Sequence, residues 1–169
     1  KLLQDKRVAV VGPRLVNLNG ATESSFGSTL TPFTELFRLF VQWCVDRNVR
    51  TVLSLVRLRA SRSRFTEWVS GACLLVRRNV AADVGFLDER YFMYFEDIDF
   101  CSSIRKLGHR VLFASDVEIV HARGLSAQTA PEATALAYQK SHLAFYEKHL
   151  PLWVPILRVY LRFRPSRPF

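Results

Sequence analysis

The chain has 169 residues, enough to bury one hydrophobic core, and this length predicts a single domain. A hydrophobic fraction of 49% with 12% aromatic residues excludes a disordered protein. Lysine and arginine number 24 against 15 acidic residues, and the net charge of +9 indicates a polyanionic partner: nucleic acid, an anionic membrane surface or a phosphorylated substrate.

The three cysteines, Cys44, Cys73 and Cys101, lie in apolar segments and form no C-x-x-C pair. An odd number of cysteines in such segments predicts reduced thiols in the core and a cytoplasmic compartment. The chain begins at Lys1 without an initiator methionine, and we expect it to be part of a longer protein.

The first third of the chain predicts a short buried strand at 8–11 that ends in a turn at Gly12-Pro13. An extended segment over 15–20 and a loop over 21–31 follow. After Pro32 we expect a helix over about 33–45 that is apolar on most of its circumference. Such a helix is either buried in the core, the commoner explanation, or pressed against a membrane or partner.

Residues 57–64 hold four arginines in eight positions. We expect a solvated loop there, and the alternative is contact with lipid headgroups or phosphate. Nucleic acid is an unlikely partner, because no aromatic-interleaved or helix-turn-helix pattern accompanies the charge.

The segment 68–76 predicts a buried strand in which Gly71 marks a close approach of backbone or ligand. The other expected elements are helices over 77–84 and 130–149 and strands over 110–114 and 117–121. The tail at 150–169 is apolar and basic together, and too short and charged to span a bilayer. It either lies in the interface of an anionic leaflet or docks on its own domain.

Three carboxylates, Glu96, Asp97 and Asp99, follow directly after five large side chains at 91–95. One or two acids at this point are explained by a helix start, where the helix dipole favours negative charge. Three so close together repel one another, and an apolar setting raises the pKa of a carboxyl group, which indicates a functional site. The helix is expected to end at Gly108.

With helical spacing, Asp97 shares a face with Phe100 and Ile104, so it points toward the protein body. Asp99 and Glu96 are expected to be its better-solvated neighbours. An acid placed like Asp97 can serve as a general base if a substrate reaches it.

Four blocks of the sequence, in this order, resemble the C-terminal part of family 2 glycosyltransferases, especially the bacterial rhamnosyltransferase-like branch. The blocks are 12–15, 68–78, 84–101 and 121–126, and the resemblance extends to about His149. It implies a GT-A fold, an α/β sandwich around a mixed sheet, that uses a nucleotide-sugar donor and Mg²⁺ or Mn²⁺ and inverts the anomeric carbon. The family's N-terminal nucleotide-binding half and its Asp-x-Asp motif do not occur before Val8. We therefore expect residues 1–149 to form a partial fold that is inactive alone.

The resemblance also implies roles for individual residues. Asp97 of the Glu96-Asp97 pair would be the catalytic base, and His121 would be a metal ligand. The implied substrate-binding residues are Trp68, Gly71 and Ala72 at the sugar, Tyr94, Glu96 and Asp99 at the acceptor, and Arg123 to Ser126 over the diphosphate.

The sequence therefore predicts the acceptor-side part of an inverting glycosyltransferase of cell-envelope polysaccharide synthesis. Its acceptor would be a glycan or a diphospholipid-linked sugar, and the protein would lie peripherally on the inner face of the cell membrane. The alternative is a non-catalytic module that keeps half of the fold to bind a membrane or a partner.

Overall fold

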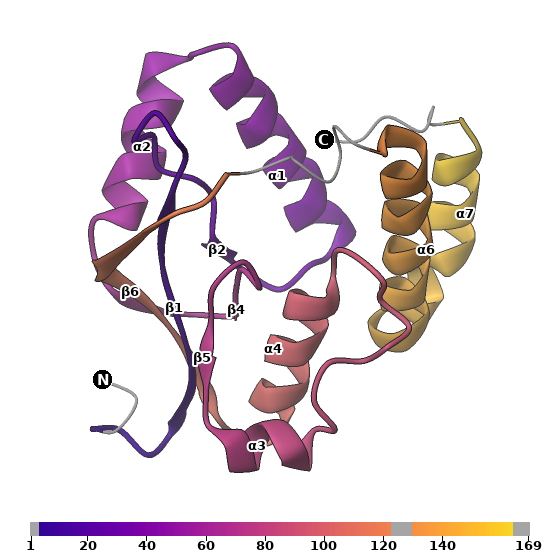
Figure 1. Cartoon of the computed structure of the whole chain (residues 1–169). Coiled ribbons are helices and arrows are strands. Elements are labelled where there is room, and N and C mark those ends of the chain that lie inside the picture. The colour runs from indigo at the N-terminus through magenta and orange to yellow at the C-terminus, as the bar shows by residue number, and fades with distance from the viewer. Residues whose placement is uncertain (1–3, 123–129, 164–169) are drawn as a thin grey trace.

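Two long strands, β1 (Val8–Val16) and β6 (Arg110–Val120), pair in parallel at the centre of a four-stranded sheet in the computed structural model, which describes residues 4–122 and 130–163 (Figure 1). The short strands β3 (Arg64–Thr66) and β5 (Leu75–Val76) add antiparallel to β6 and β1, which gives the order β3-β6-β1-β5. This mixed sheet with its helices confirms the predicted partial α/β sandwich.

Both central strands are longer than predicted. β1 continues through Pro13 to Val16 because its pairing with β6 shifts register between Pro13 and Arg14. Such an irregularity accommodates a proline, which has no N–H to donate to the ladder. The two strands predicted over 110–114 and 117–121 are one continuous strand.

The predicted single strand at 68–76 was wrong. It is divided into β4 (Trp68–Val69), a turn, and β5. β4 pairs antiparallel with β2 (Phe26–Gly27), a strand within the predicted loop, whereas β5 pairs with β1. The two ends of the segment therefore belong to different sheets, and Gly71 lies in the turn between them.

The helices are α1 (Pro32–Asp46), α2 (Arg50–Ala60), α3 (Arg78–Asp83), α4 (Glu96–Lys106), α6 (Pro131–His149) and α7 (Val154–Phe163), with the 3₁₀ turn η1 (Pro151–Trp153) between α6 and α7. Four of these were predicted at nearly these bounds. The side chain of Thr31 caps α1 by accepting from the amide of Thr34, and Pro32 occupies the first turn. α2 was missed, because the arginines of 57–60 were assigned to a solvated loop.

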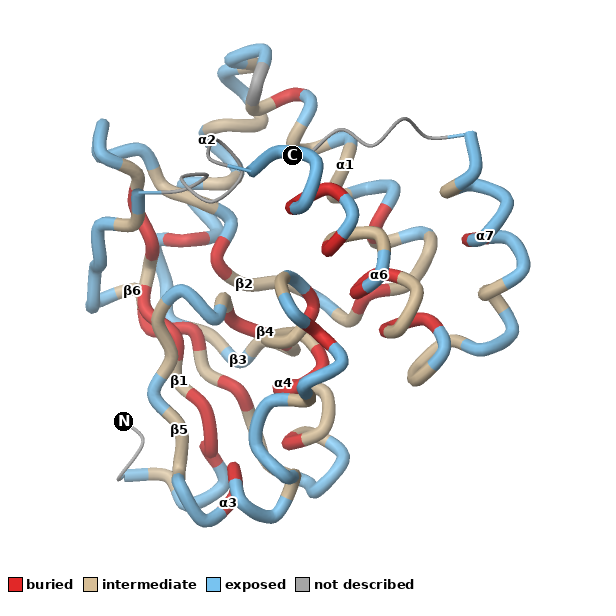
Figure 2. Tube along the Cα trace, turned by 45° about the vertical axis from the view of Figure 1, so that its right-hand side comes forward, coloured by how far each residue is buried: buried red, intermediate tan, exposed pale blue. Residues whose placement is uncertain are grey.

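Two hydrophobic clusters meet at α4. The first lies between the sheet and helices α3 and α4 and includes Val10, Phe113 and Ile104. The second joins the segment before α4 to α6 and α7, and Phe95 and Phe145 are buried in it. Ile98 packs against both clusters, which fixes the first turn of α4 between them. Figure 2 shows the buried residues following the central strands and the inner sides of α4 and α6.

The expectation that α1 is buried in the core was wrong. Its buried residues are Glu35 and Cys44, while most of its large apolar side chains are exposed. α7 packs beside α6 with Leu157 buried, so at least this part of the basic tail contacts its own domain (Figure 1). Over the described residues, no helix combines the length and hydrophobicity needed to cross a bilayer.

Gly12 provides the close packing of β1 on β4, because a Cβ atom there would lie 2.5 Å from Cβ of the fully buried Val69. Replacing Gly12 by Ala should lower the free energy of unfolding by about 1–3 kcal/mol through overpacking. Urea denaturation of the G12A variant tests this. The control is Asn79→Ala on the exposed side of α3, and an unchanged midpoint for G12A would contradict the packing described.

Candidate active site at the start of helix α4

Two consecutive residues in the left-handed region directly precede helix α4, Tyr94 at φ 67° and Phe95 at φ 69°. This conformation is costly for bulky residues and persists only where the surroundings impose it. The ring of Phe95 is buried and stacks on His142 at 5.0 Å between centroids. Packing against α6 thus holds a strained turn, and this turn sets the orientation of Glu96 and Asp97, which follow it.

Asp97 receives two backbone hydrogen bonds. The amide of Gly71 donates to its Oδ2 at 2.9 Å and the amide of Ile98 to its Oδ1 at 2.8 Å. A Cβ atom on residue 71 would lie 3.3 Å from Cβ of Asp97, so a glycine suits this close approach. Burial raises the pKa of Asp97, although these amide hydrogen bonds oppose the rise. The predicted inward orientation of Asp97 is confirmed.

Glu96 is half-buried at the start of α4, next to Asp97. Within the described residues its Oε2 is buried without a hydrogen-bond partner. Burial raises the pKa of Glu96, and the negative charge of Asp97 adds to that rise. Two neighbouring carboxyl groups with raised pKa values therefore lie at one helix start, a pattern typical of functional sites.

Asp99 is only 2% exposed, so the prediction that it is better solvated than Asp97 was wrong. Its carboxylate lies 2.6 Å from Nε2 of His149 and 2.8 Å from Nζ of Lys148, and it accepts a hydrogen bond from Tyr91. Burial alone would raise the pKa of Asp99, but the hydrogen bonds from His149 and Lys148 outweigh burial and lower it. These partners join α4 to the end of α6, so we assign Asp99 a structural role.

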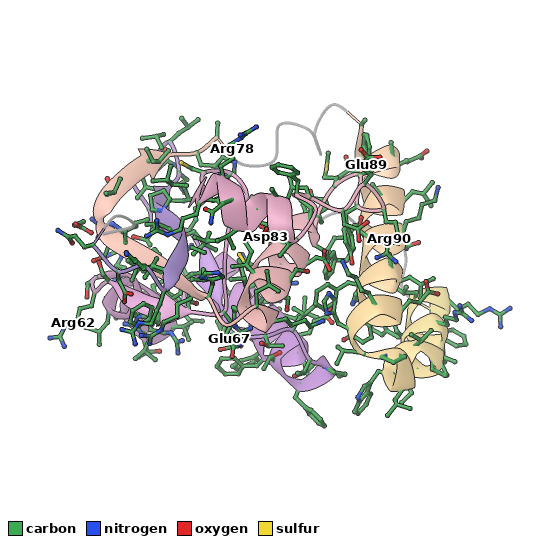
Figure 3. The ribbon with its side chains drawn as sticks, turned by 90° about the horizontal axis from the view of Figure 1, so that it is seen from below. Arg62, Glu67, Arg78, Asp83, Glu89 and Arg90 are labelled. Carbon is green, nitrogen blue, oxygen red and sulfur yellow. The ribbon has the colours of Figure 1, made fainter. Side chains whose placement is uncertain are left out.

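The same lysine extends this ionic cluster to the segment before α4. Lys148 also donates to Asp88 at 2.9 Å, and Arg90 pairs with Asp88 at 2.7 Å. The hydrogen bond from Arg90 holds the pKa of Asp88 well below its usual range. Figure 3 shows Arg90 and Glu89 on the α6 side of the molecule, with Arg62 on the opposite side.

The other predicted site residues differ in how exposed they are and in what they contact. Gly71 and Ala72 are exposed in the turn after β4. Trp68 is buried on β4, and its indole N–H donates to the carbonyl of Ser28. Tyr94 is partly exposed and meets Tyr138 edge to face at 5.5 Å. Arg123 and Ser126 lie outside the described residues.

His121, the predicted metal ligand, follows β6 and is half-buried, with Nδ1 3.2 Å from Oε2 of Glu23. Across 4–122 and 130–163, no group of three His, Cys, Asp or Glu side chains is placed to hold a metal ion. One imidazole and one carboxylate fall short of the ligand set that Mg²⁺ or Mn²⁺ requires. The described residues thus do not by themselves fit the metal that the resemblance implies.

A buried polar cluster behind the site was not predicted. Glu35 of α1 lies 3.1 Å from Nε2 of His142 and accepts a hydrogen bond from Tyr146 at 2.9 Å. It ties α1 to the helix that supports Phe95. No local pattern signals it, because the partners are separated by 107 and 111 positions.

Comparison with known proteins identifies the class to which this fold and helix start belong. The family model described as "Glycosyltransferase like family 2" matches residues 2–150. The chain therefore belongs to this family, and the resemblance read from the four sequence blocks is confirmed.

Two groups of relatives are similar to the chain. N-acetylglucosaminyl-diphospho-decaprenol L-rhamnosyltransferase of Mycobacterium tuberculosis, in strains CDC 1551 / Oshkosh and ATCC 25618 / H37Rv, is 38% identical over 96 residues, which are 56% of this chain and 31% of the relative. Low-salt glycan biosynthesis hexosyltransferase Agl10 of Haloferax volcanii (strain DS2) is 23% identical over 118 residues, 70% of this chain and 34% of the relative. The chain thus spans about a third of the length of these relatives. No solved structure matches.

Replacing Asp99 by Asn should lower the free energy of unfolding at pH 7 by about 2–3 kcal/mol, because Lys148 and His149 lose a buried anionic partner. The pKa of Asp99 is lowered in the folded state, so its stabilisation is complete above the unfolded-state value of about 4. The difference in the free energy of unfolding between the unmodified protein and D99N should therefore shrink as the pH falls through the lower folded-state pKa of Asp99.

Urea denaturation at pH 7 and at about pH 3 measures both effects. The control is Asp83→Asn, the same change at an exposed position on α3. A deficit of D99N that stays constant down to that pH, or one no larger than that of D83N, would contradict the ionic cluster.

Proposed function

We propose that the protein containing this chain transfers a sugar from a nucleotide-sugar donor to an acceptor hydroxyl, with Asp97 as the general base. The observation that carries the proposal is the placement of Asp97: a half-buried carboxylate with a raised pKa, held by the Gly71 amide at a strained helix start. Membership of family 2 and the similarity to a rhamnosyltransferase and a hexosyltransferase support the reaction class.

In the proposed step, the acceptor oxygen attacks the anomeric carbon of the donor sugar while its proton moves to the carboxylate of Asp97. The bond from the anomeric carbon to the diphosphate breaks, its electron pair leaves with the nucleotide diphosphate, and the configuration at that carbon inverts. A raised pKa makes Asp97 a stronger base than an ordinary aspartate.

Glu96 supports this role electrostatically. As long as it is ionised, its charge disfavours loss of a proton from Asp97 and so helps Asp97 to accept one. Gly71 and Ala72 are exposed in the turn that faces the carboxylate, where a sugar would approach. Tyr94 offers an aromatic edge for the acceptor.

The acceptor is proposed to be a glycan or a diphospholipid-linked sugar of the cell envelope, reached from the inner face of the membrane. Support comes from the similarity to the mycobacterial N-acetylglucosaminyl-diphospho-decaprenol L-rhamnosyltransferase. Use of Mg²⁺ or Mn²⁺ by the complete enzyme belongs to the proposal, and no step above is routed through the metal.

Replacing Asp97 by Asn should reduce transfer by about 10²–10⁴-fold, because the amide cannot take the proton. Release of nucleotide diphosphate from a panel of sugar donors measures this in the complete gene product, with Mn²⁺ and without. D83N is the matched control. Activity retained in D97N would show that Asp97 is not the general base. No release from any donor by the unmodified protein would favour a binding module.

The pH dependence of transfer should show an acidic limb that reports Asp97. The base must be ionised, so kcat/KM falls as the pH drops through its pKa, which burial raises above the ordinary aspartate value of about 3.9. A profile with no decline until the pH is below that ordinary value would contradict the assignment.

A further inference from the structure

Helix α1 presents a stripe of large apolar side chains to solvent. Its members recur at helical spacing and are between 50 and 74% exposed: Phe33, Leu36, Phe37, Phe40 and Trp43. Capping at Thr31 and the buried Glu35 on another face fix the orientation of the helix. An exposed aromatic stripe of this kind marks a surface that something covers.

The stripe continues onto the segment after α6. The ring of Phe33 meets Trp153 of η1 edge to face, with centroids 5.9 Å apart. Leu152, beside Trp153, is 90% exposed, and Ile156 on the next turn is also exposed. One apolar surface thus combines α1 with η1 and the start of α7, and we call it the α1–η1 face.

Cations adjoin the α1–η1 face at the C-terminal end of α1. The segment 47–64, which begins directly after α1 and contains α2, carries six arginines and no acidic residue. The guanidinium of Arg47 stacks over Trp43 of the stripe at 4.1 Å. Glu35, in the first turn of α1, is buried against His142 and Tyr146 and presents no negative charge to a partner.

We propose that the α1–η1 face docks the protein on an anionic bilayer, with the aromatic stripe in the headgroup–acyl boundary and the arginines of 47–64 on the lipid phosphates. Amphipathic helices with Trp, Phe and Leu on one side and cations beside them bind membrane interfaces in this way. A protein partner would need a dense array of acids to match the six arginines, whereas an anionic leaflet supplies that charge everywhere.

The docking face lies next to the candidate active site. Figure 1 shows α1 beside the start of α4. Burial raises the pKa of Asp97, and the positive charge of Arg38 on α1 opposes that rise, so α1 and Asp97 are close enough to interact. Docking through α1 would hold Asp97 near the bilayer surface, where a lipid-linked acceptor presents its hydroxyl. The inference deepens the proposed membrane location and does not rest on sugar transfer.

Flotation of the chain with vesicles of phosphatidylcholine, alone or with about 30% phosphatidylglycerol, tests the proposal without donor or acceptor. Binding is expected to the anionic vesicles, and to weaken as salt screens the arginines. The variant F37S/F40S should bind at least about tenfold more weakly, because two exposed aromatic rings are lost. Its matched control is L87S/L107S, which changes two exposed leucines beyond α3 and at the end of α4, away from α1 (Figure 1).

A second pair of variants separates charge from apolar contact. R57Q/R59Q should lower affinity about 10–30-fold at low salt, while Lys6→Gln with Arg78→Gln should change it little. Equal binding to neutral and anionic vesicles, or loss of binding in the control pairs to the same extent, would overturn the proposal. So would a dimer in light scattering that F37S/F40S dissociates, since the face would then join two copies of the chain.

Discussion

The hydrogen bond from the Gly71 amide to Asp97 joins the turn after β4 to the first turn of α4, and the candidate site depends on it. The turn exists because β4 pairs with β2 while β5 pairs with β1, so the chain must cross between two sheets at Gly71. Only a residue with little bulk allows the carboxylate so close to this backbone. The central sheet, which does no chemistry itself, thereby sets the position of the proposed base.

Asp97 and Asp99 lie two residues apart on α4 in opposite environments, which suit the proposed function of Asp97 and a structural role of Asp99. Asp97 accepts hydrogen bonds from the backbone amides of Gly71 and Ile98 and has a raised pKa, whereas Asp99 is buried against His149 and Lys148 and has a lowered one. The ionic cluster at Asp99 and the stacking of Phe95 on His142 hold α4 against α6 from two sides. That support offsets the cost of the left-handed turn at Tyr94 and Phe95.

Local patterns predicted much of this fold and the central residue of the site. Helical spacing placed Asp97 toward the protein body, and the bounds of α1, α3, α4 and α6 were close. Spacing did not predict the fate of Asp99, because its partners on α6 lie about 50 positions away and depend on how α6 packs. The prediction of a single strand over 68–76 failed for the same reason, because the partners of β4 and β5 are distant in the sequence. The exposure of α1 was not predicted, because an apolar helix has the same sequence pattern whether its side chains are buried in a core or exposed at the surface.

The most direct test of this account is the titration of the two aspartates by ¹³C NMR of their side-chain carboxyl groups, assigned with D97N and D99N. The account predicts that Asp97 titrates above the ordinary aspartate value of about 3.9 and Asp99 below it. Both groups titrating near that value, or the reverse order, would contradict the division of roles on which the proposed site rests.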